Sequence, residues 1–235
     1  MLTSNELSVD WSHNQMNAIR GLLLDVDGTL VESNDEHAHA WVQALSEGGR
    51  PVRYETLRPL IGMGGDKLLR KVADVSADSP EGKRLDDRRR QIFLQAFVPL
   101  LRPCRGAKQL LQLLKSRGLR LVVASSAKTR ELEKLLQVCG AEGLIDDQTT
   151  SDDVDRSKPD PDIIHVALRK IDLPAHEVMM LGDTPYDIEA ASKAGIRTIA
   201  LRSGGWKDAD LAGAAAIYDD PEDLARNFDT SPLVD

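Results

Sequence analysis

Four short apolar runs, each leading into a polar residue, restrict the possible folds of this chain more than any other feature. The runs are residues 19–24, 119–124, 178–182 and 196–201. Runs this short and apolar are typical of strands that are buried on both faces of a parallel sheet. Helical patterns accompany the runs at residues 107–117, 129–138, 161–170 and 185–194. Strands that alternate with helices predict an α/β fold with a Rossmann-like parallel sheet.

Residues 31–104 interrupt this alternation, because they contain helical patterns and no convincing strand. One predicted helix has an apolar face made by Ala38, Trp41, Val42 and Leu45. We therefore expect an all-helical cap at residues 31–104, inserted into an α/β core formed by residues 18–30 and 105–235. Residues 1–17 are expected to form a flexible N-terminal tail.

Two further helices are expected in this insertion. Asp66 is placed to cap a helix over residues 67–75, and Ser79-Pro80 is a suitable start for a longer helix towards Phe97. On the longer helix the apolar residues should face inward, namely Leu85, Ile92, Phe93 and Ala96. The charged residues 86–90, which include the run Arg88 to Arg90, are expected to face water.

Composition fits a cytoplasmic enzyme and permits a site for a small anion. The 235 residues include 30 Lys and Arg against 38 Asp and Glu, and the net charge of −8 argues against a broad nucleic-acid surface. No apolar run reaches the roughly 18 residues that a membrane helix needs, so we expect no membrane partner. Cys104 and Cys139 show no pairing pattern, and we expect both to be reduced. A monomer and a homodimer remain equally open.

Polar residues that can carry chemistry follow three of the apolar runs. Asp25 and Asp27 follow the first run, Ser125 the second and Asp183 the third. Ligands of open parallel sheets bind outside the carboxyl ends of the strands, so we expect these side chains to meet in one crevice. Carboxylates this close repel one another unless a cation lies between them, and Mg²⁺ prefers carboxylate, water and phosphate oxygens. The sequence therefore predicts a magnesium site, with Ser125 and Lys158 able to hold a phosphoryl group.

Four ordered segments resemble the motifs of the haloacid dehalogenase superfamily. They are residues 25–29 (DVDGT), Ser125, Lys158 within residues 157–161 (SKPDP), and residues 182–187 (GDTPYD). The resemblance covers roughly residues 20–205. It includes a helical cap between the first and second motifs, as in phosphoglycolate phosphatase and β-phosphoglucomutase relatives. Because each segment lies in the structural context that its motif needs, the four together are a strong signal.

The resemblance implies a role for each of these residues. Asp25 would attack phosphorus and become an aspartyl phosphate, and Asp27 would act as general acid and then general base. Asp25, Asp27 through its backbone carbonyl, and Asp183 would bind Mg²⁺. Ser125 and Lys158 would hold the phosphoryl oxygens, and these two residues complete the catalytic set with Asp25 and Asp27.

Asp187 has two possible roles. The resemblance implies that it orders the waters of the metal or the side chain of Lys158. On local grounds alone, it could equally cap the helix that begins at Pro185.

The expected activity is a Mg²⁺-dependent phosphatase acting on a small phosphorylated metabolite similar to phosphoglycolate or a sugar phosphate. Asp27 argues against carbon–halogen cleavage, since haloacid dehalogenases lack this second aspartate. A β-phosphoglucomutase-type mutase is the alternative. It needs a cap arginine for a second phosphate, and residues 62–66 contain none, so Arg53 or Arg70 would have to point inward. Alternatives of another class are a non-catalytic sensor of a phosphorylated ligand on the same fold and a receiver-like phosphoacceptor.

Residues near the motifs and in the cap are expected to contact the substrate. This set is Thr29, His37, Trp41, Met63, Gly64, Lys67 and Ser126. A cap that closes over the sheet would exclude bulk water and macromolecules from the site.

Overall fold

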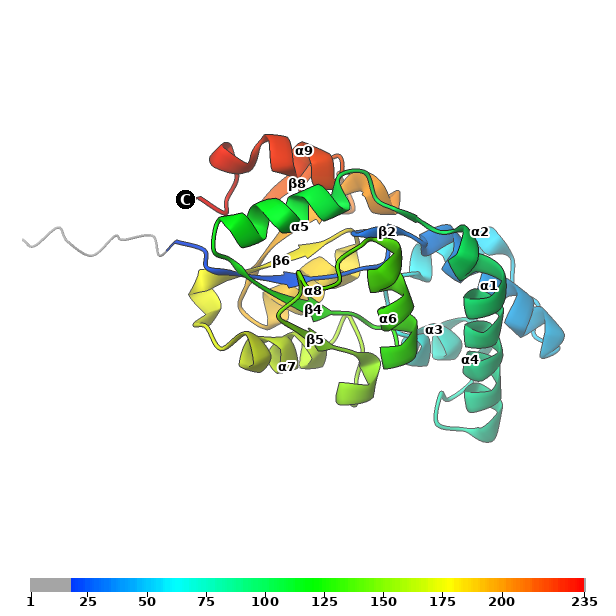
Figure 1. The fold of residues 1–235 in the computed structure, drawn as a ribbon. Helices are drawn as coiled ribbons and strands as arrows, with labels where there is room; N and C mark the ends of the chain where they lie inside the picture. The colour runs from blue at the N-terminus through cyan, green and yellow to red at the C-terminus, as the bar shows by residue number, and fades with distance from the viewer. Residues whose placement is uncertain (1–17, 235) are drawn as a thin grey trace, which may run out of the picture.

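The computed structural model describes residues 18–234, so the expected tail at residues 1–17 lies outside the described part of the chain. Figure 1 shows a sheet with helices on both faces and a group of helices, α1 to α4, beyond the carboxyl end of β1. The predicted α/β fold with a Rossmann-like parallel sheet is confirmed.

The sheet has six parallel strands in the order β5-β4-β1-β6-β7-β8. The four predicted strands are present as β1 (Gly21–Leu24), β4 (Arg120–Ala124), β6 (Val178–Gly182) and β7 (Arg197–Leu201). The edge strands β5 (Asp147–Thr149) and β8 (Ala216–Tyr218) were not predicted. Each is three residues long and pairs on one side only, so neither needs the continuous apolar run that marks a central strand.

Two hydrophobic layers hold the helices against the sheet. Leu22 and Leu24 of β1 face one layer, in which α5 (Ala107–Ser116), α6 (Thr129–Val138) and α9 (Pro221–Arg226) pack. Leu23 faces the opposite layer, with α7 (Asp162–Ile171) and α8 (Pro185–Lys193). Successive side chains of a strand point to opposite faces, and for this reason every residue of β1 is apolar or glycine and buried.

The inserted helices have a hydrophobic cluster of their own. They are α1 (Asn34–Glu47), α2 (Tyr54–Leu57), α3 (Gly65–Ala73) and α4 (Pro80–Ile92). Trp41, Leu45, Leu57, Leu68 and Leu85 are among the buried members of this cluster. Ala40, Ala44, Ile92 and Phe93 instead join the cluster of the sheet, so the base of the insertion packs directly on the core.

Two expectations for the helices and strands of the insertion are wrong. A pair of two-residue antiparallel strands, β2 (Val31–Glu32) and β3 (Arg102–Pro103), lies where the chain enters and leaves it, although no strand was expected there. The helix expected to run towards Phe97 is α-helical only as far as Ile92. A π-helical turn, Phe93–Phe97, follows it, and Ala96 on this turn is exposed. A π-helix advances by more residues per turn than an α-helix, so residues beyond Ile92 leave the face that the 3.6-residue period predicts. We propose residues 31–104 as a cap, supported by the β2–β3 ribbon.

Asp66 does not cap its helix as expected. Gly64 occupies the capping position of α3, whose first residue is Gly65. The Asp66 carboxylate instead accepts a hydrogen bond from the hydroxyl of Ser157, which precedes Lys158 in the core. Asp66 therefore joins the cap to the segment that carries a predicted catalytic residue.

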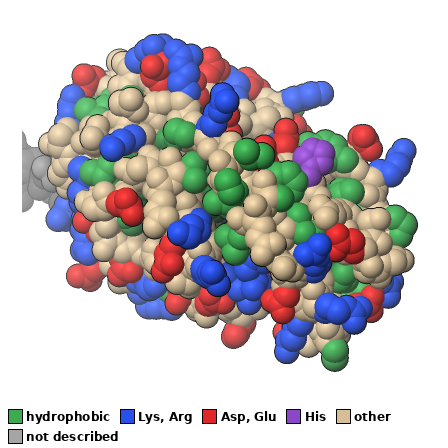
Figure 2. Space-filling view, turned by 45° about the vertical axis from the view of Figure 1, so that its right-hand side comes forward, with side chains coloured by type: hydrophobic (Ala, Val, Ile, Leu, Met, Phe, Trp, Pro, Cys, Tyr) green, Lys and Arg blue, Asp and Glu red, His purple; other side chains and the backbone are tan. Residues whose placement is uncertain are grey.

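The surface mixes charges of both signs. In the view of Figure 2, Lys and Arg side chains lie among Asp and Glu side chains over most of the face. Cys104 and Cys139 are both buried and free. Within residues 18–234, no helix combines the length and the apolar character needed to cross a membrane.

Candidate active site

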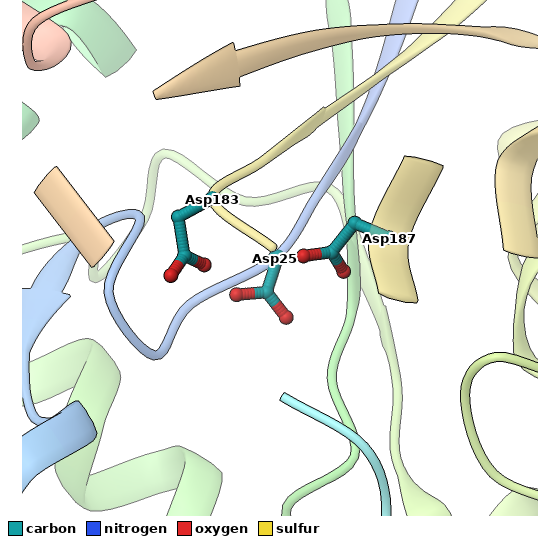
Figure 3. Close-up of side chains that lie close together, drawn as sticks. All are labelled: Asp25, Asp183 and Asp187. Atoms are coloured by element: carbon teal, nitrogen blue, oxygen red, sulfur yellow. The ribbon is translucent and has the colours of Figure 1, made fainter. Parts of the chain in front are cut away.

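The predicted crevice forms at the carboxyl end of the three central strands. Asp25 follows β1, and Ser125 and Asp183 follow β4 and β6, which pair with β1 on either side. Asp25, Asp183 and Asp187 each place a carboxylate oxygen within 4.8 Å of the others (Figure 3). All three are buried, and Asp187 comes from the first turn of α8.

The protein alone does not neutralise this carboxylate cluster. Burial raises the pKa of Asp25 to about 7, although the nearby Lys158 ammonium acts to lower it. Burial and the charges of Asp25 and Asp187 raise the pKa of Asp183 well above its usual value. Oxygen-rich, crowded and buried, the cluster has the donor set that Mg²⁺ prefers, and a divalent cation would remove the repulsion.

Tight packing fixes Asp183 in this cluster. Its two carboxylate oxygens accept hydrogen bonds from Thr29 Oγ1 (3.0 Å) and Asn34 Nδ2 (2.8 Å). A Cβ atom added at Gly28 or Gly204 would lie 2.2 or 1.7 Å from Asp183 Oδ2, so only glycine fits at these two positions. The backbone thus closes around a carboxylate that has lone pairs left for a metal ion.

Lys158 bridges two carboxylates of the cluster. Its ammonium nitrogen lies 2.6 Å from Asp25 Oδ1 and 2.7 Å from Asp187 Oδ1, and its side chain is 1% exposed. The other oxygen of Asp187 accepts hydrogen bonds from the backbone N–H and the hydroxyl of Thr184 in a capping box at the start of α8. The structure therefore gives Asp187 both contacts that the sequence left open, the helix cap and the ion pair with Lys158.

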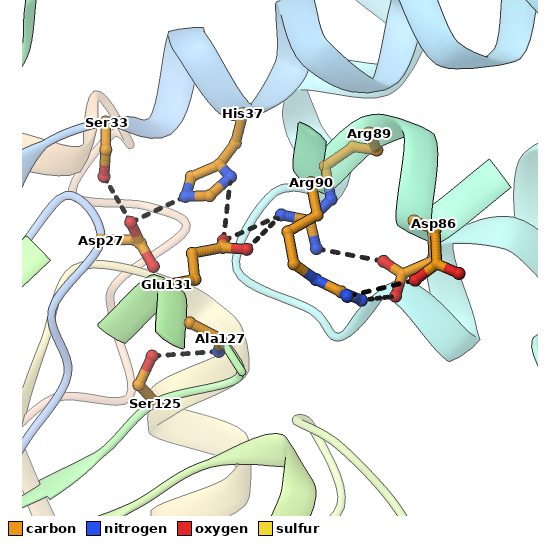
Figure 4. Close-up of polar contacts among 10 residues, drawn as sticks. Asp27, Ser33, His37, Asp86, Arg89, Arg90, Ser125, Ala127 and Glu131 are labelled. Atoms are coloured by element: carbon orange, nitrogen blue, oxygen red, sulfur yellow. Dashed lines mark hydrogen bonds and ion pairs between the residues drawn. The ribbon is translucent and has the colours of Figure 1, made fainter. Parts of the chain in front are cut away.

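Asp27 points away from this cluster, towards the cap. One oxygen of its carboxylate accepts a hydrogen bond from Ser33 Oγ (2.5 Å) and lies 2.8 Å from His37 Nε2 (Figure 4). Burial acts to raise the pKa of Asp27, but the His37 charge and the hydrogen bonds from His37 and Ser33 bring it below its usual value. The metal contact predicted for Asp27 is through its backbone carbonyl and does not depend on this side-chain direction, and Asp187 adds a third carboxylate to the cluster.

The pKa values of the two aspartates are the reverse of what their expected roles require. A nucleophile must be ionised and a general acid must carry a proton. A divalent cation in the cluster would lower the pKa of Asp25, and the negative charge of an arriving phosphoryl group would raise that of Asp27. Both changes require ligands, so the expected roles of the two aspartates need metal and substrate to be bound.

Arg89 was expected to face water and is instead 8% exposed. Its Nη1 donates to both carboxylate oxygens of Glu131 in α6, at 2.8 and 2.9 Å, and Glu131 Oε1 lies 3.8 Å from His37 Nδ1 (Figure 4). The sequence contained a signal for this burial. Arg89 is four residues after Leu85 and three before Ile92, so it lies on the inward face of α4.

A pocket of about 60 Å³ lies between Asp25 and the cap. Seven predicted site residues line it: Asp25, Asp27, His37, Trp41, Met63, Gly64 and Ser126. Sequence reasoning missed the other lining residues, which are Ile61, Gly62, Gly65, Arg89, Ala127 and Glu131. Ser126 Oγ is buried and has no hydrogen-bond partner among the described residues, so it is free to donate to a phosphoryl oxygen.

Two predicted substrate contacts lie elsewhere. Thr29 is fully buried behind the carboxylates, where its hydroxyl donates to Asp183. Lys67 forms an ion pair with Asp160 and connects the cap to the core. Sequence position placed both residues near the site, but the direction of a side chain depends on the partners that it meets in the folded chain.

The remaining predictions for the pocket concern Ser125 and two arginines. Ser125 lies behind the pocket and is fully buried, and its Oγ accepts a hydrogen bond from the backbone N–H of Ala127 (3.1 Å). Arg53 and Arg70 are exposed, and neither lines the pocket. A mutase would need one of these arginines to point inward and hold a second phosphate, and neither does.

Comparison with known proteins places the chain in a family. Residues 22–201 match the model of the haloacid dehalogenase-like hydrolases. The chain is 30% identical over 220 residues to an N-acetylmuramic acid 6-phosphate phosphatase from Pseudomonas aeruginosa, with 90% of this chain and 95% of that protein covered. It is 29% identical to a phosphoglycolate phosphatase from Pectobacterium atrosepticum, with 81% and 83% covered.

Solved structures give the same result. A hydrolase from Pseudomonas syringae superposes with a TM-score of 0.83 at 29% identity, covering 89% of this chain and 98% of that one. A putative β-phosphoglucomutase from Bacteroides vulgatus superposes with a TM-score of 0.80 at 25% identity, covering 91% and 88%. This chain belongs to the haloacid dehalogenase-like hydrolases, in the group that includes phosphoglycolate phosphatase and β-phosphoglucomutase-like proteins.

Proposed function

We propose that this protein, a phosphoric monoester hydrolase of the haloacid dehalogenase-like family, is a Mg²⁺-dependent phosphatase that works through an aspartyl phosphate on Asp25. The observation that carries the proposal is the separation of two aspartates at one strand end. Asp25 faces the pocket within a carboxylate cluster, whereas Asp27 lies in a different hydrogen-bond network on the cap side. A nucleophile and a proton carrier need such different surroundings.

The first half-reaction would transfer the phosphoryl group to the enzyme. A carboxylate oxygen of Asp25 forms a bond to phosphorus while the ester P–O bond breaks, and Asp27 gives its proton to the leaving oxygen. Lys158, which contacts Asp25, and the unpartnered hydroxyl of Ser126 in the pocket wall would hold phosphoryl oxygens. Mg²⁺ held by Asp25, Asp183 and the backbone carbonyl of Asp27, with Asp187 beside them, would supply positive charge for the phosphoryl group in the transition state.

The second half-reaction would release inorganic phosphate. Asp27 takes a proton from water, the water oxygen bonds to phosphorus, and the bond between phosphorus and Asp25 breaks. His37 and Ser33 hold the Asp27 carboxylate in position for both proton transfers. The pocket is small and lies under the cap, which supports a small phosphorylated metabolite as the substrate. The two free buried thiols are compatible with a cytoplasmic location.

The deciding experiment measures hydrolysis of p-nitrophenyl phosphate with and without Mg²⁺ in the wild type, in Asp25→Asn and in Asp229→Asn. Asp229 is 75% exposed and controls for the loss of one carboxylate. We expect Mg²⁺-dependent turnover in the wild type and in Asp229→Asn, and none in Asp25→Asn. Equal background rates in all samples would favour the sensor of a phosphorylated ligand instead.

A second measurement tests the intermediate and the mutase alternative. Acid quench and mass spectrometry should find a phosphoryl group on the peptide that contains Asp25. A screen of phosphorylated metabolites that reads both free phosphate and rearranged product separates the two activities. Rearrangement without phosphate release would establish a mutase and reject the phosphatase, and slow single turnover with acetyl phosphate alone would indicate a phosphoacceptor.

A further inference from the structure

Arg89 is the one lysine or arginine among the described residues that line the catalytic pocket. Helix α4 of the cap carries it inward, where its guanidinium carbon lies 5.2 Å from the centroid of the Trp41 ring. Two other cations near the pocket are already paired. Lys158 bridges Asp25 and Asp187, and Lys67 is paired with Asp160 outside the pocket. Within the pocket, a negative group on the leaving part of a substrate would therefore depend on Arg89.

Carboxylates of the protein already neutralise Arg89. Glu131 accepts both Nη1 hydrogen bonds, and Asp86 Oδ1 accepts one from Nη2 at 3.1 Å (Figure 4). The Glu131 side chain is 1% exposed and lines the same pocket. A second anion could reach Arg89 only by displacing Glu131, which would leave a buried carboxylate without its partner. Such a break in a buried ion pair is strongly unfavourable.

The groove next to the pocket adds negative charge. It has a volume of about 450 Å³ and shares Gly64, Gly65, Arg89 and Ser126 with the catalytic pocket, so a leaving group larger than the pocket would extend into it. Its acidic lining residues outnumber the basic ones. The acidic set is Asp66, Asp78, Asp86, Asp87 and Asp155, and the basic set is Lys83, Arg89 and Lys128.

The pocket offers hydrogen-bonding groups rather than free charge. Glu131 and His37 present a carboxylate and a ring nitrogen, and Arg89 Nε is buried without a hydrogen-bond partner among the described residues. Hydroxyl groups can both donate to a carboxylate and accept from a guanidinium nitrogen. A carboxylate or phosphate can only accept, and it would lie against Glu131.

We propose that the leaving group of the substrate is uncharged and bears hydroxyls, and that the Arg89–Glu131 pair discriminates against phosphomonoesters that carry a carboxylate or a second phosphate. The proposal rests on the phosphatase function above and narrows its substrate to the neutral sugar phosphate or polyol phosphate class. It separates this chain from a relative whose substrate is named as an acid, N-acetylmuramic acid 6-phosphate.

The test compares kcat/KM for matched phosphomonoesters with Mg²⁺ present. The pairs are glucose 6-phosphate with 6-phosphogluconate, N-acetylglucosamine 6-phosphate with N-acetylmuramic acid 6-phosphate, and fructose 6-phosphate with fructose 1,6-bisphosphate. We expect the neutral member to exceed its partner by about 100-fold in each pair that is turned over, as the loss of a buried ion pair requires. Equal or higher values for the charged members would overturn the proposal.

Variants of the pair show whether Glu131 is the cause. In Glu131→Gln, Arg89 keeps its charge but loses its main partner, and we expect the ratio of charged to neutral substrate to rise at least about tenfold. The double variant Glu131→Gln/Arg89→Gln should not show that rise, because the guanidinium that would bind the charged substrate is then absent. Glu133→Gln, an exposed position on the same helix, should leave the ratio unchanged. An unchanged ratio in Glu131→Gln would exclude Glu131 as the discriminating residue.

A binding measurement separates failure of this proposal from failure of the proposed function. Calorimetry of the same pairs on Asp25→Asn, alone and combined with Glu131→Gln, gives the preference without turnover. Absence of phosphate release from every compound, p-nitrophenyl phosphate included, would reject the phosphatase. The preference in Kd would then still support or reject the neutral-ligand proposal. Equal Kd values within the pairs would reject it.

Discussion

Two polar networks meet at Asp25-Val26-Asp27, and they differ in how the chain builds them. The metal-side network consists of Asp25, Asp183, Asp187 and Lys158, which all belong to the core, and Asn34 of α1 adds one hydrogen bond to Asp183. The cap-side network consists of Asp27, Ser33, His37, Glu131 and Arg89, and it joins helices α1 and α4 to helix α6. The first has excess negative charge that a cation would offset, whereas the second already pairs its central carboxylates within the protein.

The difference teaches that one site can separate the binding of metal and phosphoryl group from proton transfer and the selection of the leaving group. The metal-side network holds the groups that would act on the phosphoryl group, whatever the leaving group is. The cap-side network contains the proposed proton carrier, Asp27, and lines the space for the leaving group. Variants of one network should therefore leave the signature of the other intact, and the following changes test this separation.

The largest effect is expected for Asp27→Asn on the cap side. Loss of the proton carrier should lower kcat by about 1,000-fold, because general acid–base catalysis contributes on that scale. The aspartyl phosphate should accumulate, since its hydrolysis needs the base, and acid quench would show it. The gain in melting temperature on adding Mg²⁺ should stay that of the wild type, because the carboxylate lies outside the cluster. Loss of that gain would show that the networks are coupled.

Lys158→Met should have the next largest effect, this time on the metal side. Removing the ammonium leaves two buried carboxylates without an opposing charge, and we expect the free energy of unfolding to fall by about 3 kcal/mol. Urea denaturation in the presence of a chelator measures this loss in the free energy of unfolding. The exposed Lys134→Met should change stability by less than about 0.5 kcal/mol. Equal effects of the two substitutions would mean that the Lys158 ammonium does not stabilise the buried carboxylates.

Asp183→Asn should have two effects of opposite sign. Without metal the variant should be more stable than the wild type by about 1 kcal/mol, because one of the crowded charges is gone. With Mg²⁺ at about 100 times its Kd the wild type should gain about 2.7 kcal/mol, and the variant should not. Thermal denaturation with chelator gives the difference in stability without metal, and thermal denaturation with Mg²⁺ gives the stabilisation by the metal. If Mg²⁺ stabilised the variant as much as the wild type, Asp183 would not be a metal ligand.

Ser33→Ala should have the smallest effect. One hydrogen bond to Asp27 is lost while His37 remains, so kcat/KM should fall about fivefold, equivalent to about 1 kcal/mol. Ser116→Ala removes an exposed hydroxyl far from the site and should have no effect. The concentration of Mg²⁺ needed for half-maximal activity should be the same in all three proteins. If Ser33→Ala changed that Mg²⁺ concentration, the two networks would be energetically coupled.

The metal-side network was the part of the site that the sequence predicted well. Asp25 and Asp183 follow apolar runs, and a parallel sheet brings the carboxyl ends of neighbouring strands together whatever else the chain does. The cap-side network was predicted poorly. Arg89 was assigned to water because its neighbours are charged, and Glu131 was not considered at all, although the spacing from Leu85 and Ile92 places Arg89 on the inward face.

By itself, the sequence determined the parallel α/β sheet, the helical insertion after the first strand and the aspartates at the strand ends. These features follow from local periodicity and from backbone geometry that every such sheet shares. Only the tertiary structure decided that Lys67 and Thr29 turn away from the pocket while Arg89 turns into it against Glu131. Those directions depend on pairings between residues 42 or more positions apart, such as Arg89 with Glu131, and local pattern contains no information about such partners.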